Sequence, residues 1–253
     1  MGQVPAATRA LRVLRYLAGQ PDPVTLDRLA SAVGLPRSTA YHLVTAMIEE
    51  GFVVHLPEEH RYGLGVAAFE VGSGYARQEP LQRIARRQLA DLVDAVGHSA
   101  HLVVLHGRDV LYVLEERAPG RPPLVTDVGV RLPAHLTASG RAILARLPAA
   151  QVRALYPDRA AFVDRHGAGP RTPGALRSLL AETRQRGYAV EEGEVTPGFA
   201  SVAAVVVDHN DHPVAGVAVT YPSDGPGSAP GLPRIVDATS RTAATLTARL
   251  GGR

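Results

Sequence analysis

A run of hydrogen-bonding side chains at helical spacing lies within residues 36–50. The side chains on and beside the polar side of that helix are Ser38, Thr39, Tyr41, His42, Thr45 and Glu49. Groups near the N-terminal end of such a helix can reach base edges, and an arginine there suits a phosphate. An arginine in a following hairpin would contact the DNA backbone or the minor groove. The candidate DNA contacts are therefore Arg37, Ser38, Thr39, Tyr41, His42, Thr45 and Arg61.

The alternative is that these are solvated polar positions on an ordinary three-helix unit, so the surrounding elements matter. Apolar residues recur at helical intervals over 8–18 and over 26–33, where Thr25 is a good N-cap and Gly34 a left-handed C-cap. Pro36 can open the third helix as a first-turn residue. Residues 52–64 then predict a β-hairpin with a polar tip. Together these elements indicate a winged helix-turn-helix.

Other patterns that could carry chemistry are weaker. Residues 63–68 imitate a dinucleotide fingerprint, but they follow a hairpin and not the first strand of a βαβ unit. His98, His101 and His106 straddle a helix end and a strand without a carboxylate at fixed spacing, which does not predict a metal site. The sequence has no P-loop, no G-x-S-x-G elbow and no H-E-x-x-H, and no nucleophile–base pair can be placed. We therefore expect no enzyme, no cofactor and no metal.

The composition is that of an ordinary globular protein, with 253 residues, 45% hydrophobic and 20% charged, and a net charge of +3. There is no lysine; arginine suits bidentate contacts to phosphate and guanine, although a codon bias explains its use more simply. Residues 1–80 hold seven Arg against eight acids, so bulk charge neither supports nor opposes DNA binding. Because there is no cysteine, no signal peptide and no apolar run of about 18 residues, we expect a cytoplasmic protein without membrane contact.

The chain from residue 81 onwards predicts an α+β domain, in which helices accompany antiparallel hairpins. The expected elements are a helix over 81–97, strands over 100–105 and 110–115 with a turn at 107–109, a strand near 124–128, a helix over 137–147, a helix from Thr172 to Gly187, a hairpin of 201–207 with 214–220, and a helix over 232–250.

Several motifs in order resemble the isocitrate lyase regulator (IclR) family of bacterial transcription factors. The N-terminal match is L-x-x-L-A-x-x-V-G-L-P-x-S-T-A-Y-H-L over 26–43, followed by Gly51-Phe52 and Tyr62-Gly63-Leu64-Gly65. The more specific match is LPAHLTASGRAILA over 132–145, which is similar to the family's effector-domain signature. Further matching positions are Arg186-Gly187-Tyr188, Glu191-Glu192, Gly198, Ala203 and the hairpin over 205–220. The resemblance runs from about Thr8 to Leu250.

The resemblance implies a winged helix-turn-helix over 1–63, a dimerising linker helix over 64–80, and a GAF/PAS-like effector domain over 81–253, built as an antiparallel sheet flanked by helices. It also implies homodimers, often paired into homotetramers, on palindromic promoter DNA, with a small organic acid or aromatic effector. Two positions depart from the family pattern. His42 stands where the recognition helix usually has Arg, and Ser201 stands where a small apolar residue or Cys is common.

Matching the family's ligand-lining positions gives eight candidate effector-binding residues: Leu124, Ala138, Ser139, Glu191, Phe199, Ser201, Ala218 and Thr220. Thr137 can cap a helix whose first N–H groups would accept a carboxylate; the alternative is that Thr137 and Ser139 only cap that helix. Glu191 would disfavour a second anion and favour a hydroxyl or ammonium group, unless Glu191 and Glu192 are simply a solvated acidic pair.

We therefore expect a DNA-binding regulator that is gated by a small metabolite, with a carboxylate as the expected effector. The alternative from another class is a small-molecule enzyme or carrier whose N-terminal helices contact other proteins.

Overall fold

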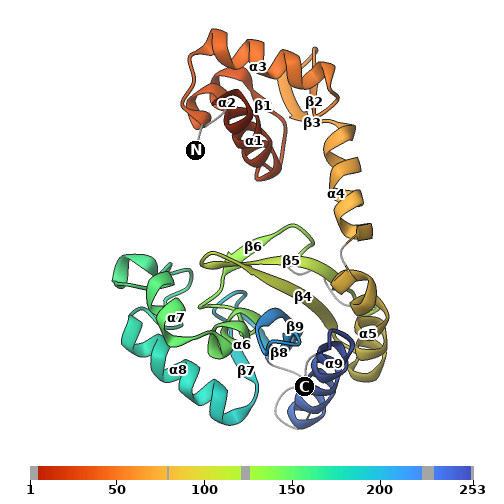
Figure 1. Cartoon of the computed structure of the whole chain (residues 1–253), viewed down its shortest axis with the longest axis vertical. Helices are drawn as coiled ribbons and strands as arrows, with labels where there is room; N and C mark the ends of the chain where they lie inside the picture. The colour runs from red at the N-terminus through yellow and green to blue at the C-terminus, as the bar shows by residue number, and fades with distance from the viewer. Residues whose placement is uncertain (1–4, 79, 121–125, 224–230, 252–253) are drawn as a thin grey trace. The chain divides into compact units, whose positions relative to one another are not determined.

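The computed structural model describes residues 5–78, 80–120, 126–223 and 231–251. The chain divides into two compact units, Met1–Glu79 and Pro80–Arg253 (Figure 1). The first unit contains α1 (Pro5–Ala18), β1 (Val24–Thr25), α2 (Leu26–Val33), α3 (Arg37–Glu49), β2 (Val53–Leu56), β3 (Arg61–Leu64) and α4 (Val66–Gln78). The winged helix-turn-helix predicted from the sequence is thus confirmed.

The predicted caps of α2 are also confirmed. The Thr25 hydroxyl accepts from the backbone N–H of Arg28 at 3.4 Å, and Gly34 ends the helix with φ of 69°. Val13, Leu29, Val44 and other apolar residues of α1, α2 and α3 form one core beneath these helices. The core therefore buries the apolar side of α3 and leaves its polar side outward.

A small antiparallel sheet of order β1-β3-β2 completes this unit. Gly65, just after β3, approaches Gly51 so closely that a Cβ on Gly65 would lie 2.2 Å from the Gly51 carbonyl oxygen. Gly65, one glycine of the pattern that imitates a dinucleotide fingerprint, therefore serves close backbone packing at the base of the wing.

The second unit is an antiparallel six-stranded sheet with helices on both faces. Its elements are α5 (Pro80–Val96), β4 (Ser99–His106), β5 (Asp109–Glu116), β6 (Arg131–Pro133), α6 (Ala138–Arg146), α7 (Ala149–Leu155), a 3-10 turn (Arg159–Ala161), α8 (Pro173–Arg186), β7 (Ala189–Glu192), β8 (Phe199–Val207), β9 (Pro213–Pro222) and α9 (Leu232–Arg249). The strand order is β6-β5-β4-β9-β8-β7. The α+β prediction is confirmed.

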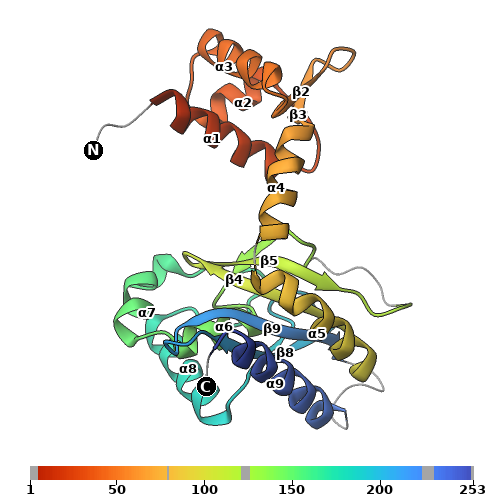
Figure 2. The same ribbon diagram turned by 45° about the vertical axis from the view of Figure 1, so that its right-hand side comes forward.

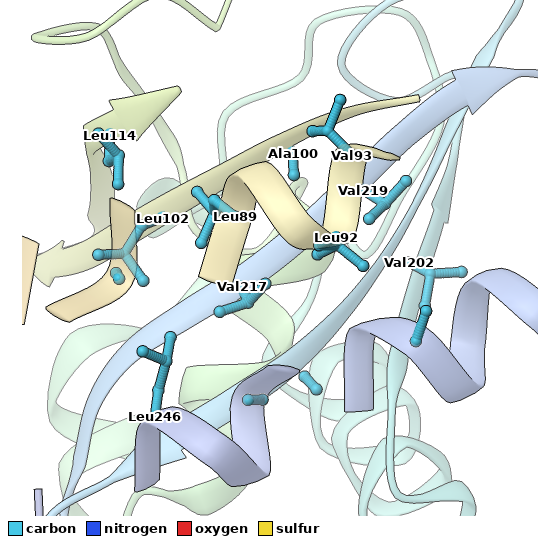
Figure 3. Packing of buried hydrophobic residues seen from close by; sticks show 14 of the residues in the cluster. Leu89, Leu92, Val93, Ala100, Leu102, Leu114, Val202, Val217, Val219 and Leu246 are labelled. Atoms are coloured by element: carbon cyan, nitrogen blue, oxygen red, sulfur yellow. The ribbon is translucent and has the colours of Figure 1, made fainter. Parts of the chain in front are cut away.

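Alternation along the strands assigns side chains to the two faces of this sheet. Leu102, Val202, Val217 and Val219 point to α5 and α9, which lie side by side over that face (Figures 2 and 3). The residues between them on each strand, such as Ser201 and Ala218, point to the opposite face, which α6 covers. No helix within the described ranges is long and apolar enough to cross a bilayer.

The prediction of a strand near 124–128 is wrong for the part of that segment that the structure describes. Residues 126–128 have no strand structure, and 124–125 lie outside the described residues. The strand that pairs with β5 is instead β6. Gly129, with φ of 90°, turns the chain before β6, and the Val130 carbonyl accepts from the N–H of Tyr112 at 3.0 Å. The sequence analysis also missed the short elements β1, α7 and β7, which contain too few residues to show a periodicity.

Candidate functional site

The polar side of α3 and the β2–β3 wing form an exposed hollow of about 600 Å³. Four of the predicted DNA contacts line it: Arg37, Ser38, Tyr41 and His42. All four are exposed, and Tyr41 packs edge-on against the His42 ring at 5.8 Å between centroids. The hollow thus combines a cation, hydroxyls and an imidazole on one accessible helix face, a set that can contact both phosphates and bases.

Of the other three predicted DNA contacts, Thr45 and Arg61 have partners within the protein. Thr39 and Thr45 are half-buried, and the Thr45 hydroxyl donates to the Tyr41 carbonyl at 2.9 Å. Arg61 is exposed on the wing, but its guanidinium donates to the Pro23 carbonyl at 3.1 Å and lies 3.9 Å from a Glu59 oxygen. The structure does not bring these three residues into the lining of the hollow.

Arg37 is also engaged, because its guanidinium lies 2.9 Å from a carboxylate oxygen of Asp27 on α2. The two side chains are 70% and 65% exposed, and such surface pairs contribute at most about 1 kcal/mol. A phosphate can therefore displace Asp27.

Sequence reasoning missed two histidines in the lining, His55 on β2 and His60 in the turn of the wing. His55 stacks on Tyr62 with centroids 4.6 Å apart. Periodicity could not assign these rings to the hollow, since their position depends on how β2 packs against α3 in the folded protein.

The second unit holds a pocket between the start of α6 and the sheet. All the predicted effector-binding residues line it except Leu124, which lies outside the described residues. The remaining lining residues, which the effector prediction did not include, are Tyr112, Thr126, Thr137, Val195 and Thr196. The free volume is about 20 Å³, which is about the room that one water needs.

The N-terminus of α6 lies at the wall of this pocket. The Thr137 hydroxyl caps the helix by accepting from the N–H of Gly140 at 3.0 Å, which confirms Thr137 as the cap. Ala138 and Ser139 open the helix and line the pocket. A helix N-terminus carries a partial positive charge, so this arrangement suits an anionic group.

A row of polar side chains crosses the sheet on the pocket face. The strand registers pair Glu191 with Ser201 and Ser201 with Thr220. The Ser201 hydroxyl donates to a Glu191 carboxyl oxygen at 3.1 Å and lies 3.0 Å from the Thr220 hydroxyl. These groups form one hydrogen-bonded chain in which each hydroxyl can donate or accept.

Glu191 is only 3% exposed, so the reading of Glu191 and Glu192 as a solvated pair is wrong for Glu191. Burial, together with the hydrogen bond and charge of Glu194, raises the pKa of Glu191 to about 8. A carboxyl with that pKa is largely protonated at pH 7, so the expected repulsion of a second anion does not arise.

Glu194 takes the opposite protonation state. Its own burial opposes ionisation, but the charge and hydrogen bond of Arg141 outweigh burial and lower the pKa of Glu194. The Arg141 guanidinium on α6 is buried and donates to Glu194 at 2.8 Å. Opposite Glu191, burial raises the pKa of Tyr112, so this phenol is neutral.

The three histidines of the metal hypothesis have separate surroundings. His101 is buried, with Nε2 2.8 Å from the hydroxyl of Thr126, a pocket-lining residue. His106 is exposed and its Nδ1 lies 2.9 Å from the Arg131 guanidinium. Within the part of the chain that the structure describes, no three potential metal ligands gather in one place.

Both parts of the chain match models of one protein family. Residues 73–246 match the family described as "Bacterial transcriptional regulator IclR C-terminal", and residues 6–57 match the "IclR helix-turn-helix domain". The chain is 36% identical over 212 residues to a glycerol operon regulatory protein of Streptomyces coelicolor, covering 84% of this chain and 82% of that protein.

Solved structures show the same fold over nearly the whole chain. An IclR transcriptional regulator from Alicyclobacillus acidocaldarius superposes with a TM-score of 0.85 at 25% identity, covering 99% of this chain and 100% of that one. An IclR homologue from Microbacterium hydrocarbonoxydans, complexed with 4-hydroxybenzoate, gives 0.81 at 21% identity, covering 97% and 98%. A helix-turn-helix that presents α3, a six-stranded effector domain and matches to both family domains lead to one conclusion: the chain belongs to the IclR family of bacterial DNA-binding transcriptional regulators, which are not enzymes.

Proposed function

We propose that this regulator binds a palindromic promoter site as a dimer or a dimer of dimers, and that a small carboxylate metabolite gates the binding. The observation that carries the proposal is the pocket, where a helix N-terminus, several hydroxyls and the buried carboxyl of Glu191 converge. The described residues that line it include no Arg or Lys. A carboxylate would be held by Ala138, Ser139 and the hydroxyls of Ser201 and Thr220, with Phe199 as an apolar wall and Ala218 and Glu191 completing the site.

The same proposal assigns the DNA contacts. Ser38, Tyr41 and His42 would read base edges in the major groove, while Arg37 would exchange Asp27 for a phosphate. Thr39 and Thr45 would support this face of α3, and Arg61 would contact the backbone from the wing. A regulator that binds bacterial promoter DNA would act in the cytoplasm.

Large exposed apolar side chains on α4 support self-association through the proposed linker, residues 64–80. Val66, Phe69 and Val71 are 72%, 74% and 62% exposed in the single chain. Exposed apolar surface of this kind marks interaction sites. A two-fold dimer through α4 would present the DNA-binding part (1–63) and the effector part (81–253) twice each, and a palindrome requires two DNA-binding parts.

The small free volume of the pocket gives the gating its physical basis. A carboxylate with several heavy atoms does not fit in about 20 Å³, so its binding requires the pocket walls to move. A ligand that binds the opened arrangement better than the closed one shifts the population toward it. That shift would change the placement of the two DNA-binding parts of a dimer.

Two measurements test the proposal. A footprint on the protein's own upstream region should show a symmetric protected site that weakens as salt rises. A thermal-shift panel of acetate, lactate, benzoate and 4-hydroxybenzoate, each paired with its primary amide, should show stabilisation by at least one acid. An asymmetric footprint contradicts the dimer, and a panel without any stabilising acid contradicts the carboxylate.

A further inference from the structure

Arg141 is a buried cation that lies near two carboxyl groups, those of Glu191 and Glu194, at the edge of the effector pocket. Arg141 on α6 is 2% exposed and uses all three guanidinium nitrogens. Its Nε donates to the His135 carbonyl at 2.9 Å, its Nη1 to the Val190 carbonyl at 2.7 Å, and its Nη2 to Glu194 at 2.8 Å. The positive charge of Arg141 therefore pairs with Glu194, and this pairing favours the ionised form of the Glu194 carboxyl.

Glu191 lies next in this chain of groups and has no cation of its own among the described residues. Its two carboxyl oxygens accept from the Ser201 hydroxyl and from the backbone N–H of Glu194, each at 3.1 Å. Two ionised carboxylates beside one buried Arg would leave an uncompensated buried charge, which is strongly unfavourable. One proton is therefore retained, and because Glu194 holds the arginine, the proton stays on Glu191.

The other titratable groups around Glu191 add no positive charge that would compensate an ionised Glu191. Tyr112 on β5 and Tyr221 on β9 are kept neutral, since burial raises the pKa of each phenol. Glu192 is exposed on the same strand and adds no positive charge. The proton on Glu191 thus decides whether the pocket presents a neutral or an anionic wall to a ligand.

We propose that Glu191 sets the charge specificity of the effector pocket: the pocket admits a carboxylate only while Glu191 is protonated. Glu191 stays protonated because Arg141 is paired with Glu194 and not with Glu191. Effector binding is then coupled to that proton and weakens in alkaline conditions. This inference rests on the proposed function, because it assumes a carboxylate effector in this pocket.

The test uses the full-length protein and needs no identified natural effector for its first part. Carbon-13 NMR of the glutamate carboxyl groups, with the Glu191 signal assigned by its loss in Glu191→Gln, should show that Glu191 titrates near pH 8. In the second part, calorimetry measures lactate against lactamide and benzoate against benzamide from pH 6 to pH 10, since none of these four ligands changes its charge over that range. Affinity for the acid that binds should fall about tenfold per pH unit once Glu191 ionises, while the amides stay constant.

The Glu191→Gln variant should bind the same acid with no pH dependence, because an amide cannot ionise, and Glu191→Asp should retain the dependence. If Glu191 titrates in the ordinary carboxyl range, or if wild-type affinity for a bound acid is flat over this pH range, the inference is overturned and the carboxylate effector stands. If the amides bind and neither acid binds at any pH, the carboxylate class fails and the inference fails with it.

Discussion

Gly216 on β9 lies against Ser139 at the start of α6: a Cβ on Gly216 would be 2.9 Å from the Ser139 carbonyl oxygen and 3.1 Å from its Cβ. The absence of a side chain at Gly216 therefore lets the helix N-terminus approach the sheet. This contact sets how deep Ala138 and Ser139 sit in the pocket.

Substitution Gly216→Ala should push α6 away from the sheet and destabilise the second unit by about 1–3 kcal/mol, because the close contact is with backbone atoms that cannot rotate away. Thermal unfolding measures this loss, and acid binding should weaken with it. The control is Gly174→Ala in the first turn of α8, where the nearest atom to a new Cβ is 3.9 Å away. Equal stability of the two variants would contradict the argument.

Stability should depend on pH through Glu191. Its pKa rises from 4.5 to about 8 on folding, so between these values the folded protein keeps a proton that the unfolded chain has lost. The contribution of Glu191 to stability therefore falls as pH rises from 4.5 to 8 and levels off above that. At 1.36 kcal/mol per unit the effect is on the order of 3–5 kcal/mol.

Glu191→Gln should accordingly be more stable than wild type at pH 8 and of similar stability at pH 4.5, measured by denaturant unfolding. Glu192→Gln, one residue along the strand but exposed, is the matched control and should change stability by no more than about 0.5 kcal/mol at either pH. If the stability difference between Glu191→Gln and wild type does not grow from pH 4.5 to pH 8, Glu191 is ionised in the folded protein and the prediction is wrong.

DNA affinity should respond oppositely to changes at the two partners of the Asp27–Arg37 pair. Arg37→Ala should weaken binding to specific and random duplexes alike and reduce the salt slope by about 1, since it removes a phosphate contact. Asp27→Asn should strengthen binding by about 1.4- to 5-fold, which corresponds to the 0.2–1 kcal/mol of a surface ion pair. Fluorescence anisotropy across a salt series measures both, and a loss of affinity in Asp27→Asn would rule out competition for Arg37.

Self-association should weaken when the apolar surface of α4 is made polar. Phe69 is 74% exposed in the single chain, so Phe69→Ser leaves the core intact and removes only a contact to another copy. Sedimentation equilibrium should show a shift toward monomer. Val163→Ser, at a residue of the second unit that is 52% exposed, should leave the association constant unchanged. A similar loss in both variants would place the interface elsewhere.

Local sequence determined the elements with strong periodicity and recognisable ends. Thr25 and Gly34 fix the ends of α2, and Thr137 and Thr172 start α6 and α8, because caps act within three residues of themselves. The polar side of α3 could also be predicted from the sequence, since the spacing of its apolar residues decides which side chains must face out.

Tertiary structure alone decided what the candidate side chains do. Arg37 is paired because the fold brings Asp27 of α2 beside it, and His55 and His60 line the hollow because β2 packs against α3. Glu191 keeps its proton because folding places Arg141, 50 positions earlier in the sequence, beside Glu194 and not beside Glu191. Charge and burial are sums over all neighbours in space, so a linear pattern that names the residues of a pocket does not fix their protonation or their partners.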